Sequence, residues 1–209
     1  MVGSFALASG GVVMKTKIWI PCGALLVASS LFAGPITYAV VMNGPSESPA
    51  NTSTATGFAT IIIDSTANTL NILSLTFSGL AGTSTASHIH CCTAVPLTGT
   101  AGVATQTPFF AGFPIGVTSG SYSMSFDMTQ ASTWNSPFIT ANGGTPAGAE
   151  AALLAGIAHG EAYLNIHSTA FPGGEIRGFL IPEPGTMALA IAALAGLFLV
   201  SRVRPIKSV

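Results

Sequence analysis

The stretch "GEAYLNIHSTAFPGGEIRGFLI" occupies residues 160–181 and has the pattern of two strands joined by a turn. In its first half, Ala162, Leu164 and Ile166 alternate with polar or aromatic side chains, so the two kinds point to opposite faces of a strand. The letters "FPGG" at 171–174 supply the Pro and Gly residues that are typical of a turn. The stretch therefore predicts a β-hairpin with one buried face.

Shorter alternating segments lie upstream of this hairpin, and turn residues separate them. They occupy residues 57–64, 69–80, 87–92 and 120–128. One segment has a helical pattern instead, with Thr145 as N-cap, Pro146 in the first turn and good helix formers up to Ala158. This pattern predicts an all-β fold, an antiparallel β-sandwich with one short helical insert. We expect additional hydrophobic helices at the two ends of the chain.

The N-terminal region has the pattern of a secretory signal peptide. Lys15 and Lys17 precede a short apolar run, and small residues up to Ala39 offer a cleavage site. We therefore expect residues 1–39 to be removed on export, with Met14 as an alternative start of the chain. A retained membrane anchor is the competing interpretation, although the apolar run is shorter than the roughly 20 residues that a span needs.

The C-terminal region carries a second short apolar segment. Pro182, Glu183 and Pro184 precede an apolar segment at residues 187–200, and three basic residues follow it. This order resembles the PEP-CTERM sorting signal of Gram-negative bacteria, here residues 182–209. The resemblance implies that an exosortase, a membrane cysteine protease, recognises the Pro-Glu-Pro motif and that the protein reaches the envelope surface or is released. An ordinary short membrane anchor, with its basic end in the cytoplasm, is the alternative.

Residues 57–181 remain as the folded domain, after a Ser-, Thr- and Pro-rich segment at 40–56 that we expect to be a flexible arm. Within residues 40–181, Arg177 is the only Lys or Arg residue, against six Asp and Glu residues. This composition lacks a basic patch, so we expect no nucleic-acid partner. We expect Arg177 to pair with Glu161 or Glu175.

Three parts of this domain resemble the CHRD domain, a module first defined in chordin and common in bacterial exported proteins. They are "HIH" at 88–90, "AYLNIHS" at 162–168 and "FPGGEIRG" at 171–178. The resemblance runs from about residue 55 to residue 180 and implies an immunoglobulin-like β-sandwich without an established activity. Its signature polar face would contain Tyr163, Asn165, Glu175 and Arg177. The chain departs from the family pattern at Cys91 and Cys92, where a glycine is commoner.

Two histidines of the "HIH" motif point to the same face of their strand, because His88 and His90 are two residues apart. His167 lies on the polar face of the predicted hairpin. If the two strands are close, three imidazoles converge, and imidazole is a ligand for copper and zinc. These residues are thus candidate metal ligands. In the alternative interpretation, they are polar residues that form hydrogen bonds across one face of the sheet.

Cys91 and Cys92 are the only cysteines left after removal of the signal peptide. In an oxidising compartment they can form a vicinal disulfide, remain two buried thiols, or bond to another molecule. His159 stands just before a glycine at the end of the predicted helix, where a capping role is expected.

The sequence favours an exported cell-envelope or extracellular-matrix protein with a structural or binding role. Phosphate-binding Gly-rich motifs, nucleophile elbows and metalloprotease motifs do not occur in it, so we expect no enzymatic activity. The expected processing partners are signal peptidase and exosortase, with transient anchoring in the inner membrane, and the expected ligand is an extracellular protein or polysaccharide. The alternative is a copper- or zinc-binding or redox protein that uses the histidine face.

Overall fold

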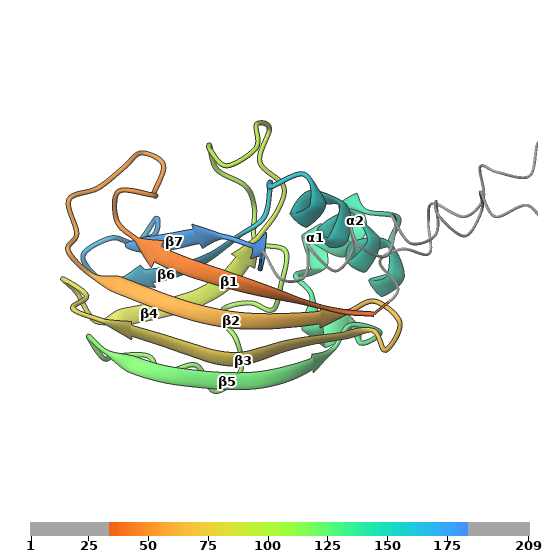
Figure 1. Ribbon diagram of the computed structural model, residues 1–209, viewed down its shortest axis with the longest axis horizontal. Coiled ribbons are helices and arrows are strands. Elements are labelled where there is room, and N and C mark those ends of the chain that lie inside the picture. Colours follow the sequence, from red (N-terminus) through yellow and green to blue (C-terminus); the bar gives the residue numbers. More distant parts are fainter. Residues whose placement is uncertain (1–33, 184–209) are drawn as a thin grey trace, which may run out of the picture. The chain divides into compact units, whose positions relative to one another are not determined.

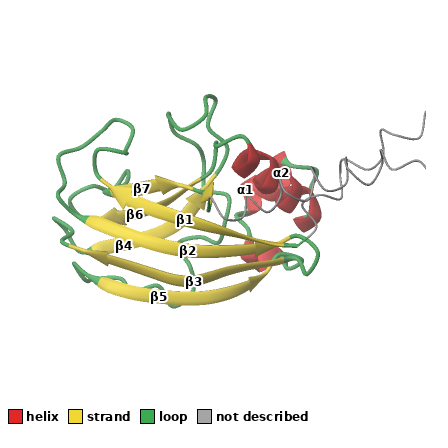
Figure 2. Ribbon diagram, in the orientation of Figure 1, coloured by secondary structure: helices red, strands yellow, loops and turns green. Residues whose placement is uncertain are grey.

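The computed structural model of the protein describes residues 34–183 and consists mainly of antiparallel strands (Figure 1). The strands are β1 (Pro35–Asn43), β2 (Thr56–Asp64), β3 (Thr69–Ser78), β4 (Ser84–His90), β5 (Gly120–Asp127), β6 (Tyr163–Ser168), β7 (Ile176–Phe179) and β8 (Ile181–Pro182). The helical elements are a 3-10 turn (Ala131–Thr133), α1 (Ser136–Ala141) and α2 (Pro146–Ala158). Figure 2 shows both α-helices together at one end of the strands.

The strands form one sheet in the order β4-β6-β7-β1-β2-β3-β5, and β8 pairs with β1. Every pairing is antiparallel, which confirms the predicted all-β class. The sheet curls, so that β4, β6 and β7 lie behind β1, β2 and β3 in Figure 1. The path between the two halves is continuous, joined through the pair Asn43 and Arg177 of β1 and β7. It thus differs from a sandwich of two separately hydrogen-bonded sheets, although two layers still face each other.

One hydrophobic core fills the space inside the curled sheet. Leu164 and Ile166 of β6 and Ile89 of β4 are fully buried there, together with Ile61 of β2 and Leu70 of β3. The alternation along each strand sends these side chains inward. Burial of such a side chain contributes roughly 1.5–3 kcal/mol. The core therefore fixes which face of β4 and β6 points outward, and that outward face carries the candidate metal ligands.

Strand β1 occupies sequence that we assigned to the end of the signal peptide and to the flexible arm. It begins at Pro35, before the expected cleavage site after Ala39, and it pairs with β2 along its whole length. Tyr38 and Val40 are buried in the core, which explains why this segment forms a strand. Residues 1–33, which hold most of the expected signal peptide, lie outside the described residues.

The rest of the expected arm is a loop that hydrogen bonds tie to the hairpin. The side chain of Asn51 donates to the backbone oxygen of Glu175 at 3.0 Å, and the Ser53 hydroxyl donates to the Glu175 carboxylate at 2.6 Å. Residues 40–56 therefore differ from the expected flexible arm: they comprise the end of β1, a tethered loop and the first residue of β2.

The first residues of the expected sorting signal continue the sheet. Ile181 and Pro182 pair with Ala39 and Tyr38 of β1, and the backbone N–H of Glu183 donates to Thr37 at 3.0 Å. The remainder of the expected signal, including Pro184, and both expected terminal hydrophobic helices lie outside the described residues. None of the helices within residues 34–183 has the length and apolar character needed to span a membrane.

Helix α2 has the boundaries that its capping residues predict. The Thr145 hydroxyl accepts a hydrogen bond from the backbone N–H of Gly148 at 3.1 Å, and His159 is the C-cap residue. Helix α1 was not predicted as a separate element, although it lies in the region, residues 129–158, that the sequence indicated as helical, because it is only six residues long and has no apolar periodicity.

Candidate metal centre

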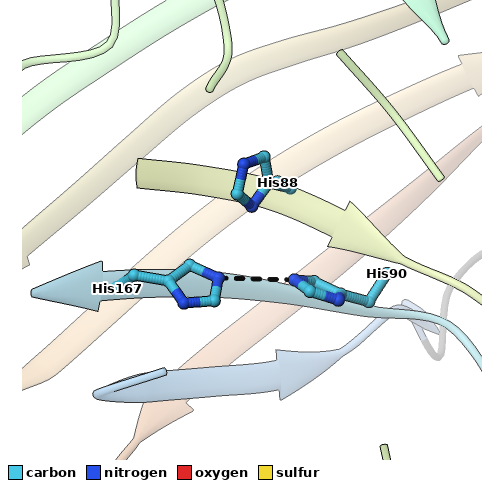
Figure 3. Close-up of side chains that lie close together, drawn as sticks. All are labelled: His88, His90 and His167. Carbon is cyan, nitrogen blue, oxygen red and sulfur yellow. Dashed lines mark hydrogen bonds between the residues drawn. The ribbon is translucent and has the colours of Figure 1, made fainter. Parts of the chain in front are cut away.

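Three histidines meet on the outward face of strands β4 and β6. His88 and His90 come from β4 and His167 comes from β6, as Figure 3 shows. The two strands are antiparallel neighbours, with Ala86 opposite His167 and Asn165 opposite His88. His167 is therefore a diagonal neighbour of His88 across the strand pair, and its ring lies close to the rings of His88 and His90. The structure thus brings together all three residues that the sequence proposed as ligands.

The three side chains offer ligand nitrogens that all lie within 4.8 Å of one another. The ring centroids of His88 and His167 are 5.2 Å apart, and those of His90 and His167 are 5.6 Å apart. Only 6% of His88 and 7% of His90 is exposed, whereas His167 is half-buried. An ion would therefore reach the cluster from the side of His167.

Each ring has one nitrogen that faces a backbone carbonyl oxygen of a covering loop. The pairs are Nε2 of His88 with Pro108 at 2.6 Å, Nδ1 of His90 with Ala101 at 2.9 Å, and Nδ1 of His167 with Pro172 at 2.9 Å. A carbonyl oxygen can only accept a hydrogen bond, so the facing nitrogen carries the proton. The other nitrogen of each neutral ring is then a free lone pair. Metal-binding histidines typically have such a carbonyl partner.

The free nitrogens of two rings face each other directly. Nε2 of His90 lies 3.4 Å from Nε2 of His167, the contact marked by the dashed line in Figure 3. A hydrogen bond between them requires an additional proton, because both protons of the neutral rings are already donated to carbonyls. The free nitrogen of His88 is Nδ1, which is buried and has no hydrogen-bond partner in the described part of the chain. Among residues 34–183, no hydrogen-bond donor faces these lone pairs.

Burial keeps the three rings neutral. It lowers the pKa of His90 to about 4, against a partial opposing effect of the hydrogen bond to Ala101. Burial also lowers the pKa of His88 and of His167 below the usual value, and the neighbouring His167 adds to the effect on His88. At pH 7 the cluster therefore offers unprotonated imidazoles, which is the form that binds metals.

Two nitrogens of the cluster have the spacing of ligands that share one copper or zinc ion. Two nitrogens that each lie ~2.0–2.1 Å from a metal are about 3.3–3.6 Å apart at tetrahedral or trigonal angles. The measured separation of 3.4 Å between the Nε2 atoms of His90 and His167 lies in this range. Within residues 34–183, these three histidines are the one group of His, Cys, Asp and Glu side chains with metal-binding geometry.

The signature arginine, Arg177 of β7, is fully buried and lies over the ring of Tyr163 on the neighbouring strand β6. Its Nε atom is 3.8 Å from the Glu47 carboxylate, and it donates to the backbone oxygens of Ser46 and, at 2.6 Å, of Gly99. The expected partners, Glu161 and Glu175, were wrong. Glu47 lies 130 residues before Arg177 in a loop, so no local pattern could indicate the pairing.

The other signature residues also serve the packing of loops on this face. Asn165 is buried beside the side chain of Glu47. The Glu175 carboxylate accepts hydrogen bonds from the Ser53 hydroxyl and the Ala81 N–H, both at 2.6 Å. Burial alone would raise the pKa of Glu175, but its hydrogen bonds outweigh burial and lower that pKa.

Tyr163 connects the cluster with the arginine. The Tyr163 ring stacks on His90 with 4.9 Å between centroids, and Cζ of Arg177 lies 4.6 Å from the Tyr163 centroid. Because β6 lies between β4 and β7, one aromatic ring separates the metal-binding face from a buried cation.

Cys91 and Cys92 follow His90 directly and are joined by a disulfide. The disulfide packs on α2 at Gly156, where an added Cβ would lie 2.3 Å from both sulfur atoms. Cys91 is buried and Cys92 is exposed. The cysteines do not belong to the histidine cluster, so the sequence motif "HIHCC" divides into two separate features.

Sequence reasoning missed the carbonyl groups that orient the rings. Ala101, Pro108 and Pro172 act through backbone oxygens, which every residue possesses, so their identities carry no signal. The Gly- and Pro-rich composition of the loops was the available hint, because such loops can fold tightly over a sheet face.

The pattern that defines the CHRD domain matches residues 38–180 of the chain. This range begins within β1 and ends just before β8, so it covers the strands that build the candidate metal centre. No curated protein and no solved structure matches the chain. A CHRD domain is a secreted or extracellular module of uncertain biochemical role. Its match covers more than half of the sequence, and the chain belongs to the CHRD domain family.

Proposed function

We propose that this protein is an exported domain that binds one copper or zinc ion through His88, His90 and His167. The 3.4 Å separation of two unprotonated Nε2 atoms, with a third free nitrogen on His88, carries this proposal. A purely structural cluster would be expected to give each buried ring nitrogen a hydrogen-bond partner. We thus prefer the metal-binding alternative to the structural role, with a hydrogen-bonded histidine face, that the sequence favoured.

Metal binding is tested by titration of the purified protein with copper or zinc after treatment with a chelator. We expect one ion per chain, measured by inductively coupled plasma mass spectrometry after gel filtration. The double variant His90→Ala/His167→Ala should retain less than a tenth of that amount. The matched control is His159→Ala, because His159 caps α2 outside the cluster and should leave the stoichiometry unchanged. Equal metal content in the double variant and the wild type would contradict the proposal.

We further infer that the domain binds its metal ion after export across the inner membrane and that it catalyses no reaction. Support comes from the family membership and from the sequence order at both ends of the chain. We further propose that signal peptidase and an exosortase process the chain, the latter at Pro182, Glu183 and Pro184. Mass spectrometry of the protein from cells with and without the exosortase should detect a shortened C-terminus only in the former. An identical C-terminus in both would refute this route.

The opposite sheet face supports a second candidate function, binding of a neutral extracellular polysaccharide. This face presents hydroxyl groups between exposed apolar side chains, with Phe58 44% and Leu73 61% exposed. Its hydroxyl groups belong to Thr60, Ser74, Thr76, Ser121, Ser123 and Ser125. A sugar polymer offers the same mixture of hydroxyl and apolar surface. The fraction of protein that sediments with envelope polysaccharide should fall in the double variant Phe58→Ser/Leu73→Ser and stay unchanged in His88→Ala. An unchanged fraction in both variants would exclude this face as the binding surface.

A further inference from the structure

We propose that the three-histidine centre selects monovalent copper over divalent zinc and divalent copper. This inference rests on the proposed metal-binding function and adds the charge and oxidation state of the ion. Three features of the described residues carry it: a ligand set without negative charge, a buried cation close by, and a nitrogen spacing that does not suit divalent copper.

The ligand set contains nothing that compensates a high charge. Each of the three rings is neutral, and in the described part of the chain no carboxylate joins them in the cluster. The cost of moving an ion from water into a low-dielectric site grows with the square of its charge, so a divalent ion costs about four times as much as a monovalent one. Zinc sites commonly offset this cost with thiolate or carboxylate ligands. The burial of His88 and His90 makes the difference significant.

The buried guanidinium of Arg177 strengthens the discrimination. Its Cζ atom, from strand β7, lies 4.6 Å from the centroid of the Tyr163 ring on β6. The same ring stacks on His90 of β4, the neighbour of β6 on the opposite edge. Glu47, at 3.8 Å, is its only carboxylate partner in the described residues. Burial raises the pKa of Glu47 to about 7, so this carboxylate is only partly ionised at neutral pH. A residual positive charge therefore repels any ion in the centre, and it repels a divalent ion twice as strongly.

The nitrogen spacing distinguishes the two oxidation states of copper. Divalent copper prefers square-planar or tetragonal coordination, in which adjacent nitrogens at ~2.0 Å from the metal are about 2.9 Å apart. Nε2 of His90 and Nε2 of His167 are instead 3.4 Å apart. The carbonyl groups of Ala101 and Pro172 hold the opposite edges of these rings and oppose a closer approach. Trigonal coordination, which suits monovalent copper, keeps this pair of nitrogens at its present 3.4 Å spacing.

Ala86 offers a way to reverse the selection. It faces the same side of β4 as His88 and lies opposite His167 in the register of the sheet. A carboxylate introduced by Ala86→Asp would therefore stand beside the cluster and compensate the charge of a divalent ion. Ala86→Asn has nearly the same size and shape without the charge, so it is the matched control.

The experiment measures dissociation constants of the purified wild type and both variants for each ion separately. Monovalent copper is titrated under anaerobic conditions against a chromophoric copper(I) chelator, and zinc and divalent copper are titrated against chelators of their own. For the wild type we expect binding of monovalent copper at least tenfold tighter than binding of either divalent ion. A tenfold preference between the two copper states raises the reduction potential by about 59 mV. Ala86→Asp should reduce the preference at least tenfold, and Ala86→Asn should leave it within threefold.

The outcomes separate this inference from the proposed function. Tighter or equal binding of a divalent ion to the wild type at the same three histidines would overturn the selection and leave the metal site intact. Absence of binding for all three ions would refute the proposed function itself. If Ala86→Asp does not fold, Glu47→Gln replaces it, because removal of this carboxylate should widen the preference for monovalent copper. A preference that neither charge change alters would overturn the electrostatic argument.

Discussion

The buried pair of Glu47 and Arg177 allows a quantitative prediction of how the free energy of unfolding depends on pH. Replacement of Glu47 by Gln keeps the size of the side chain and removes its ability to ionise. Only 6% of the Glu47 side chain is exposed, and its Oε1 atom has no hydrogen-bond partner among residues 34–183. Burial raises the pKa of Glu47 from 4.5 to about 7, although the charge of Arg177 opposes this shift. The folded state therefore favours the protonated carboxyl.

The direction of the pH effect follows from this raised pKa. Below pH 4.5 the Glu47 carboxyl is protonated in the folded and the unfolded state, so its contribution to stability is fully present. As the pH rises from 4.5 through about 7, the unfolded chain ionises first and the contribution is lost. At about 1.36 kcal/mol per pKa unit the loss is roughly 3 kcal/mol, and residual solvent screening reduces it to about 2 kcal/mol.

The assay is urea-induced unfolding of the wild type and of Glu47→Gln at pH 5 and pH 8. The two proteins should have similar free energies of unfolding at pH 5. At pH 8 the variant should be about 2 kcal/mol more stable, because it does not ionise. If Glu47 instead acts as an ionised partner of Arg177, its loss should cost about 3–5 kcal/mol at pH 8. A less stable variant at pH 8 would refute our reasoning about this carboxyl.

Three further predictions concern the disulfide, the hairpin and the N-terminus. Alanine favours helices, yet Gly156→Ala should lower the free energy of unfolding by about 1 kcal/mol in chemical denaturation. The reason is that its Cβ would meet the sulfur atoms of Cys91 and Cys92 at 2.3 Å. An increase in stability would contradict this packing. Glu175→Gln should lower the free energy of unfolding by about 1.5–3 kcal/mol at pH 7. Because the pKa of Glu175 is lowered in the folded state, this loss of stability should shrink as the pH falls below the ordinary pKa of 4.5. A loss that does not depend on pH in the same unfolding assay would be evidence against an ionised carboxylate. N-terminal sequencing of the exported protein should find a first residue at or before Pro35, whereas a start at residue 40 would mean that the mature protein lacks half of β1.

The sequence was informative wherever a residue pattern has a direct geometric meaning. Alternation placed β6 and β7 in a hairpin, and the spacing of His88 and His90 put both rings on one face. The N-cap Thr145 marked the start of α2. Pairing between distant segments has no such signal.

Strand β1 shows why the rest was not predictable. Its apolar side chains follow a signal-like run without a break in composition, so the sequence does not separate a leader from a buried strand. The same limit applies to Glu47, because its loop contacts Arg177 through the tertiary fold and not through any local sequence pattern. The carbonyl groups that fix the histidine tautomers are products of loop conformation, which residue types alone do not determine.

The central claim is that His88, His90 and His167 together bind one ion, and X-ray absorption spectroscopy of the copper-loaded protein tests it most directly. The account predicts a first coordination shell of three nitrogen atoms at about 2.0 Å with the outer-shell scattering of imidazole rings. This signal should disappear in the variant His90→Ala/His167→Ala. A shell dominated by sulfur or oxygen, or a spectrum that the double variant leaves unchanged, would contradict the claim.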